Sequence, residues 1–134
     1  MRGARAVQKA IIQSFSHADI SISIVWVNML PLDNVVTAGF MAKAMQDPRV
    51  RHFHDSHKQV GQIIAQSLGG PGKVAWDVYL FYAKGDEWAD SLPPPTKWAH
   101  QLQDSWIDPA HYHSGDDLIQ ELDRAMSQLA TQDQ

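Results

Sequence analysis

Two short segments bring histidines close enough together to suggest metal chemistry. The first, HFHDSH, contains His52 and His54 on a predicted strand and His57 just beyond it. The second, HYHSGDD, contains His111 and His113 and ends in two aspartates. Side chains two positions apart on a strand lie on the same face, and two imidazoles held in that way can bind a metal ion. If the two segments met in the fold, they could form a zinc or nickel site.

The same histidines also allow a structural interpretation, which we favour. Histidines can occur on the solvent face of an edge strand simply as polar residues, without binding a ligand. Residues 52–57 and 111–113 lie far apart in the sequence, and no pattern indicates that they meet. We therefore assign no metal, cofactor or catalytic residue. A metal-binding protein or metal-dependent enzyme that uses the HFHDSH segment is the alternative hypothesis for function.

Asp77 is a charged residue inside the apolar segment VAWDVYLFYA, which is typical of a strand. A buried carboxyl group with a raised pKa can act as a general acid or base. His100, on the strand expected opposite, is the candidate partner, and Ser105 or Tyr79 would have to supply a nucleophile. We favour the simpler interpretation, in which Asp77 caps a neighbouring loop or pairs with an Arg or Lys.

The segment WADSLPPPTKW combines Trp88 and Trp98 with three consecutive prolines. Tryptophan beside an extended polyproline stretch can form a docking surface for a partner protein or a small apolar ligand. The alternative, which we favour, is that both tryptophans cover the end of the fold.

Composition excludes several classes of protein. The chain has 134 residues, the size of one domain over residues 1–134, and its net charge of −4 argues against a dedicated binder of nucleic acid or membrane surfaces. No apolar run approaches the roughly 20 residues that cross a bilayer, and no signal peptide is recognisable, so we expect a soluble, cytoplasmic protein. With 0 cysteines, the chain cannot form a disulfide, a thiolate nucleophile or a Cys-ligated metal site.

Hydrophobic periodicity predicts four helices and four strands in the order α, β, α, β, α, β, β, α. The expected segments are residues 1–15, 20–30, 32–46, 49–55, 56–68, 74–83, 96–102 and 114–132. The residues expected to face inward are Val7, Ala10, Ile11, Phe15, Val36, Phe40, Met41, Val60, Ile63, Ile64, Leu68, Leu118, Leu122, Ala125, Met126 and Leu129. Right-handed crossovers imply parallel pairing of the early strands, and the last two strands read as a hairpin. The fold class is therefore α/β, with helices on both faces of a mixed sheet.

In this order the chain resembles the thioredoxin-like superfamily, in its longer, peroxiredoxin-like variant. The segments that carry the resemblance are SISIVWVNMLPLD, DPRVRHFHDSHKQVGQ, VAWDVYLFY and the C-terminal helix. It implies an α/β sandwich with a mixed sheet of about four strands. The family's first strand and its Cys-x-x-Cys loop would precede Met1, and the family's cis-proline is absent around Ala75–Asp77. The resemblance thus implies a fold truncated at its N-terminus, without the family's redox activity.

The resemblance places the missing strand between the apolar segments 22–28 and 76–82, and expects residues 5–16 to pack on a sheet that contains both. The backbone groups of these segments lack partners unless the two strands pair directly or another chain fills the gap. We expect the two strands to pair directly. From the exposed edges and the tryptophans, we also expect a homo-oligomer in the form of a symmetric dimer. The leading hypothesis is a non-redox thioredoxin-like protein that binds a protein or ligand without catalysis. A relic fold with no selected activity is a third hypothesis.

Overall fold

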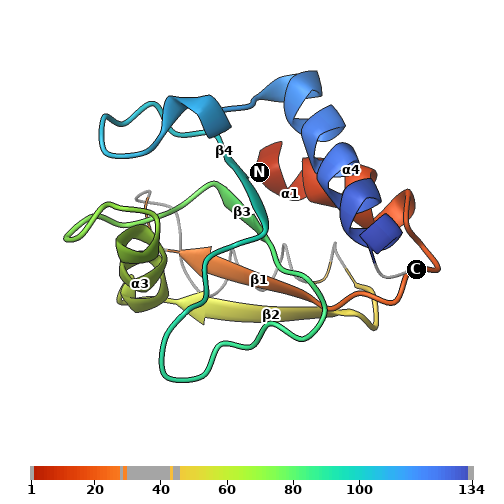
Figure 1. Ribbon diagram of the computed structural model, residues 1–134, viewed down its shortest axis with the longest axis horizontal. Coiled ribbons are helices and arrows are strands. Elements are labelled where there is room, and N and C mark those ends of the chain that lie inside the picture. Colours follow the sequence, from red (N-terminus) through yellow and green to blue (C-terminus); the bar gives the residue numbers. More distant parts are fainter. Residues whose placement is uncertain (1, 28, 30–42, 44–45, 133–134) are drawn as a thin grey trace.

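The computed structural model describes residues 2–27, 29, 43 and 46–132, and these form a mixed α/β structure (Figure 1). Its elements are α1 (Arg2–Val7), the π-helical turn η1 (Gln8–Gln13), β1 (Ile22–Val27), β2 (Val50–Asp55), α3 (Gln59–Ser67), β3 (Val78–Phe81), β4 (Lys97–His100), the 3-10 turn η2 (Pro109–His111) and α4 (Gly115–Gln132). The second predicted helix, with Val36, Phe40 and Met41, falls almost wholly outside the described residues.

The described strands form two separate two-stranded sheets. β1 pairs with β2 in parallel, from Ile22 opposite Val50 to Val27 opposite Asp55. β3 pairs with β4 in an antiparallel hairpin. The parallel pair and the hairpin are therefore confirmed.

The expected single sheet, with residues 22–28 paired directly to residues 76–82, is wrong for the described residues, because β1 and β3 belong to different sheets. The side chains of Ile22 and Tyr79 pack on the same apolar cluster, which contains Phe81. Side chains, and not a ladder of backbone hydrogen bonds, therefore join the two sheets at this point.

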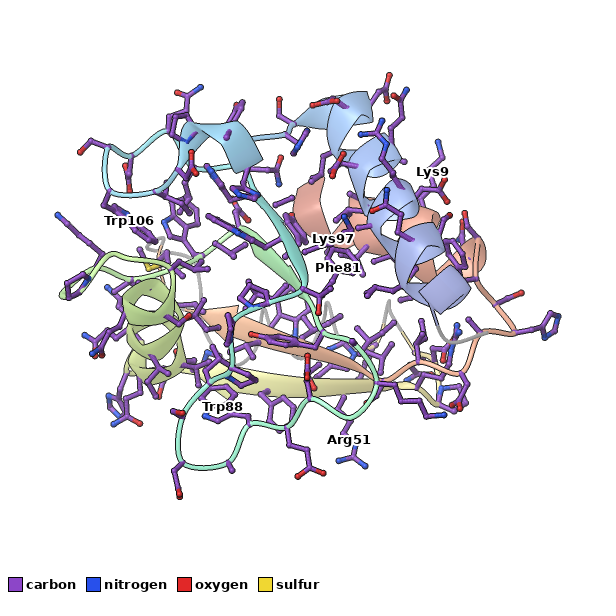
Figure 2. The ribbon with its side chains drawn as sticks, viewed as in Figure 1. Lys9, Arg51, Phe81, Trp88, Lys97 and Trp106 are labelled. Atoms are coloured by element: carbon purple, nitrogen blue, oxygen red, sulfur yellow. The ribbon has the colours of Figure 1, made fainter. Side chains whose placement is uncertain are left out.

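The main core lies between the hairpin and the helices α1, η1 and α4. Figure 2 shows Phe81 on the inner side of the hairpin, toward these helices. The buried members of this cluster are Ala6, Ala10, Ile11, Phe81, Ala99, Leu118, Leu122, Ala125, Met126 and Leu129. The α4 stripe is thus confirmed, because all five of its predicted inward-facing residues are buried. No helix in the described part of the chain combines the length and apolar character needed to span a membrane.

α3 packs most closely through its small residues, and of the four residues that the sequence expects to face inward, Val60, Ile64 and Leu68 are partly buried and Ile63 is exposed. Its buried residues are Gly61 and Ala65, whereas Ile63 is 43% exposed. The reason is a close approach of the backbone, since the Ala75 N–H donates to the Gly61 carbonyl oxygen at 2.8 Å. A Cβ atom at Gly61 would lie 2.7 Å from Val74 Cγ1, so this side of the helix has no room for a larger side chain.

Two glycines end α3 as the sequence predicts. Gly69 adopts a left-handed backbone with φ 96°, and the Gly70 N–H donates to the Ala65 carbonyl oxygen at 2.8 Å, which completes a Schellman motif. The indole of Trp106 lies against Gly70, where a Cβ atom would collide with the ring, and Figure 2 places Trp106 beside the end of α3. This contact fixes the segment after β4 on the helix.

Arg49 ties the N-terminal helix to the parallel sheet. Its guanidinium donates to the carbonyl oxygen of Ile12 (3.3 Å) in the last turn of η1 and to those of Phe15 (2.6 Å) and Ala18 (3.1 Å) in the turn that follows. Two further hydrogen bonds, of 2.9 and 3.0 Å, join the same guanidinium to the Asp47 carboxylate. The Arg49 carbonyl oxygen accepts the first hydrogen bond of the β1–β2 pair, from the Ile22 N–H at 2.9 Å. A cation at the carbonyl end of a helix is favourable, and the carboxylate fixes its position.

We expect acid to weaken this contact. Hydrogen bonds from Arg49 lower the pKa of Asp47 from 3.8 to about 2. A carboxyl group whose pKa is lower in the folded state stabilises the fold above its unfolded pKa, and that contribution is lost as the pH falls toward the folded value. Urea unfolding between pH 6 and pH 2 should therefore show a steeper loss of stability below pH 4 for the wild type than for Asp47→Asn. Equal slopes for the two proteins would contradict the pairing.

We also expect Gly61→Ala to destabilise the protein by about 1–3 kcal/mol, because the added methyl group has no space. Urea unfolding measures the effect, and Gln62→Ala, at a neighbouring exposed position, is the matched control. Val74→Ala removes the nearest side-chain atom, so the double variant should lose less stability than the two single losses added together. A Gly61→Ala protein as stable as the wild type would show that α3 does not pack closely on residues 74–75.

Candidate functional site

His52 and His54 lie on the more covered face of β2. Both are half-buried, whereas Arg51 and Phe53, on the opposite face, are exposed, and Figure 2 shows Arg51 pointing away from the sheet. Trp26 of β1 stacks on His52, with ring centroids 6.0 Å apart, and its indole N–H donates to His52 Nδ1 at 3.1 Å. The expectation that these histidines face solvent is therefore wrong, because the neighbouring strand supplies a large aromatic side chain on the same face.

The rest of the HFHDSH segment has a structural role. The buried carboxylate of Asp55 accepts the N–H groups of Gln59 at 2.8 Å and Gly61 at 3.0 Å. These N–H groups have no partner inside the helix, so Asp55 caps α3 from the end of β2. His57 is exposed in the intervening turn.

The described residues contain no group of three or more His, Asp or Glu side chains that could hold a metal ion. His111 and His113 are engaged elsewhere, at the turn that precedes α4. His111 Nδ1 lies 3.0 Å from the Trp98 carbonyl oxygen, and His113 Nδ1 lies 2.7 Å from the Asp117 carboxylate. The geometry of the described residues therefore gives no support to a metal site built from the two histidine segments.

Trp98, His100 and His111 form an aromatic stack on β4. The indole of Trp98 lies 4.0 Å from the His111 ring and 5.8 Å from the His100 ring, measured between centroids. His100 is fully buried, and each of its ring nitrogens has a partner. Nδ1 accepts the Leu102 N–H at 3.0 Å, so the ring proton lies on Nε2, which donates to the Asp108 carbonyl oxygen at 2.8 Å. This histidine is a neutral structural group.

The hypothesis of an Asp77–His100 pair is wrong. Asp77 is exposed and has a left-handed backbone, with φ 51°, and its carbonyl oxygen accepts the Gln101 N–H at 3.0 Å. The residue opposite His100 in the hairpin is Val78. Because both His100 nitrogens are already bonded to backbone groups, no ring nitrogen is left for Asp77.

The two residues considered as nucleophiles are not placed for catalysis. Ser105 is exposed in the turn after β4. Burial raises the pKa of Tyr79 far above its usual range, and the charge of Asp77 adds to the effect. The Tyr79 hydroxyl accepts a hydrogen bond from Gln101 Nε2 at 2.9 Å and remains protonated at physiological pH. The described residues therefore offer no activated nucleophile at this position.

The open feature of the fold is a pair of strand edges. The Ile22 N–H donates to the carbonyl oxygen of Arg49, the residue before β2. Because successive backbone groups alternate in direction, those of Ser23 and Val25 point away from β2, whereas the Val27 carbonyl oxygen on the same side already accepts the Met29 N–H at 3.0 Å. The same alternation applies to the hairpin. Because the Asp77 carbonyl oxygen bonds to the Gln101 N–H, the backbone groups of every second residue from Asp77 point toward β4, and those of Val78 and Leu80 point away from β4. Within the described part of the chain, no other strand pairs with either edge.

The side chains near these edges are incompletely covered. Not one residue of β1 is buried, although its sequence, ISIVWV, is apolar in five of six positions, and only Phe81 is buried in β3. Next to β3, the Tyr82 hydroxyl is shielded from solvent but has no hydrogen-bond partner among the described residues. A strand of this composition is normally covered on both faces, so β1 and β3 are less buried than their apolar sequences predict.

The two tryptophans of the proline-rich segment differ in environment. Trp98 is partly buried and stacked between histidines, in agreement with the structural interpretation. Trp88 lies on the long connection between β3 and β4 and is 48% exposed, so the expectation that both are covered is wrong for Trp88 (Figure 2). A large exposed indole is suited to contact with another molecule.

A comparison with models of protein families, with curated proteins and with solved structures gave no match to this chain. The candidate site therefore stands on its geometry alone.

We expect His100→Phe to destabilise the protein by about 2–4 kcal/mol. Phenylalanine fills much of the same space but leaves the Leu102 N–H and the Asp108 carbonyl oxygen without their partner. Urea unfolding measures the loss. His113→Ala is the control, because it removes a more exposed imidazole from the adjacent turn and should cost less than about 1 kcal/mol. A loss for His100→Phe as small as that of the control would refute the structural role of His100.

Proposed function

We propose that the protein is a non-enzymatic binding module that associates with other polypeptide chains, including a second copy of itself, through the open edges of β1 and β3. The observation that carries the proposal is that, among the strands in the described part of the chain, the apolar strands β1 and β3 each pair on one side only. An open strand edge presents a row of backbone donors and acceptors, and such an edge readily pairs with a strand of another chain. The exposed Trp88 supplies a second contact surface.

The properties of the edges favour binding over catalysis. The strands β1 and β3 contain no charged residue, so pairing with a partner would not place an ionised side chain in an apolar contact. Several of the residues that could have carried chemistry have structural partners, since Asp55 caps α3, His100 bonds to backbone groups and His113 pairs with Asp117. With no cysteine in the sequence, dithiol exchange is not available to this chain.

Only part of the thioredoxin-like interpretation is kept in the proposal. It needs residues 22–28 and 76–82 in one sheet, and the described strands do not provide that sheet by themselves. A strand contributed by another chain would join them, with β2 and β4 at the outside. The argument against redox chemistry is independent of this interpretation, since it rests on composition alone.

Self-association is the directly testable part of the proposal. We expect light scattering to give the mass of a dimer, about twice the 15.0 kDa of the chain. Val25→Pro should shift the protein toward monomer, because it removes an N–H that points to the open edge but none that bonds to β2. Val25→Ile keeps that N–H and is the matched control, and Trp88→Ala tests the second surface. A wild-type monomer at all concentrations, unaffected by any of these changes, would count against self-association.

A further inference from the structure

We infer that His100 is an acid-sensitive switch, which holds residues 101–113 closed while its imidazole is neutral and releases them when the imidazole takes up a proton. This segment connects the end of β4 to α4 and contains η2. The inference goes beyond the proposed function, because it concerns a different part of the fold and does not depend on the edges of β1 and β3.

The side chain and backbone of His100 hold the start, the middle and the end of the segment. Nδ1 accepts the Leu102 N–H at 3.0 Å, and Nε2 donates to the Asp108 carbonyl oxygen at 2.8 Å. At the far end, the His113 N–H donates to the His100 carbonyl oxygen at 2.9 Å, and the Tyr112 ring meets the imidazole by its edge, with centroids 5.8 Å apart. One fully buried residue thus closes the whole segment.

Only the neutral imidazole fits these contacts. A backbone N–H can only donate, so Nδ1 has to offer its lone pair to Leu102, and the ring proton lies on Nε2. A second proton on Nδ1 would set two N–H groups against each other at 3.0 Å and leave a charge on a residue that is shielded from solvent. Uptake of that proton therefore requires the Leu102 hydrogen bond to break.

No carboxylate bonds to the ring to favour its charged form, because both ring nitrogens bond to backbone groups. On the β3 side, Asp77 is exposed. The Asp108 carboxylate accepts a backbone N–H of η2 at 2.9 Å, and at the start of α4 the Asp117 carboxylate lies 2.7 Å from the His113 ring. The other titratable groups on the elements around His100 are the phenols of Tyr79 and Tyr112.

The two other histidines of this region respond to acid differently. His113 is next to a carboxylate, and His111 Nδ1 donates to the Trp98 carbonyl oxygen at 3.0 Å. A proton added to either ring keeps these contacts, since each then has an N–H on both of its nitrogens. Acid therefore breaks a hydrogen bond at His100 and preserves those of His111 and His113.

The segment can open without the main core. Its buried apolar residues are Leu102 and Ile107, and among the described residues the cluster around Phe81 contains neither of them. The indole of Trp106 lies against Gly70, at the end of α3 (Figure 2). Opening would free Trp106 and Ile107 while α1, η1, α4 and the hairpin remain packed, as in other local unfolding reactions.

The expected response lies between pH 7.5 and pH 5. An imidazole exposed to solvent takes up a proton near pH 6.5, whereas the closed segment excludes it. The open form therefore binds one more proton, so the closed form is favoured fully above that pH and progressively less below it. The open population should rise about thirtyfold from pH 7.5 to pH 5. Asp47 does not act in this range, because its pKa is about 2.

Amide hydrogen exchange of the full-length protein, followed by NMR and corrected for the intrinsic effect of pH, measures this opening. We expect the Leu102 amide to lose protection about thirtyfold from pH 7.5 to pH 5, and the Leu122 amide, in the core of α4, to keep it. His100→Gln places an amide that does not titrate at this position, so protection of Leu102 should be the same at both pH values. His113→Gln removes another imidazole of the segment and, as the matched control, should keep the thirtyfold change.

A second measurement needs no variant, and it decides the question if His100→Gln does not fold. Long-range proton–nitrogen-15 spectra of the wild type show which nitrogens of His100 carry protons. We expect the closed form to keep the neutral pattern, with the proton on Nε2, at every pH at which Leu102 is protected. A charged imidazole in a protected segment would overturn the inference. So would a wild-type Leu102 amide whose protection does not change with pH, the same change in His100→Gln, or an equal loss at Leu122.

Discussion

The guanidinium of Arg49 is the contact on which the arrangement of this molecule most depends. The two sheets share no ladder in the described residues, so the backbone hydrogen bonds that usually order strands do not fix one sheet relative to the other. Arg49 supplies part of that order, because its guanidinium binds carbonyl oxygens after the N-terminal helix and its own carbonyl oxygen, just before β2, accepts the Ile22 N–H. Asp47 holds the guanidinium in place from the opposite side. One short segment thus sets the position of β1 relative to the helices that pack on β3.

This way of joining the sheets explains why, among the described strands, β1 and β3 can each have a partner strand on one side only. The cluster around Phe81 is closed by α1, η1 and α4, and it reaches β1 only through Ile22 at the beginning of the strand. Burial of that cluster stabilises the fold without requiring that the remainder of β1 be covered. The protein can therefore present a half-exposed strand such as ISIVWV and still have a well-packed interior. The cost is an edge that favours association, which is the basis of the proposed function.

The parts of the fold that the sequence predicts correctly are those set by local patterns. The α4 stripe, the double-glycine end of α3 and the strand identity of residues 50–55 all follow from residues close together in the chain. The errors come from partners that are distant in sequence. Trp26 covers the face of His52, and Val74 excludes larger residues at Gly61. No spacing of residues within one local segment could have predicted either contact.

The prediction for Asp77 is also wrong because it depends on a partner that is distant in the sequence. Its position inside an apolar segment predicts a strand residue, whereas its backbone is left-handed and the strand begins one residue later. The Gln101 N–H donates to the Asp77 carbonyl oxygen, so the hairpin ends at Asp77, whose charged side chain is exposed to solvent. The division of the described strands into two sheets was likewise not predictable, because direct pairing of residues 22–28 with residues 76–82 satisfies the same pattern. Strand order is a property of the whole chain.

The histidine-rich turn before α4 makes the two edges of the hairpin different, because it covers part of the edge on β4. The His113 N–H donates to the His100 carbonyl oxygen at 2.9 Å, and Tyr112 bridges to His100, so backbone from this turn covers part of the outer edge of β4. The stack of Trp98 on His111 holds the turn against the strand. A covered edge does not add strands readily, while the opposite edge of the same hairpin, on β3, is open among the described residues. The residues that looked like candidates for catalysis therefore cover one edge of the hairpin, and under the proposed function another chain would be added on the side away from β4.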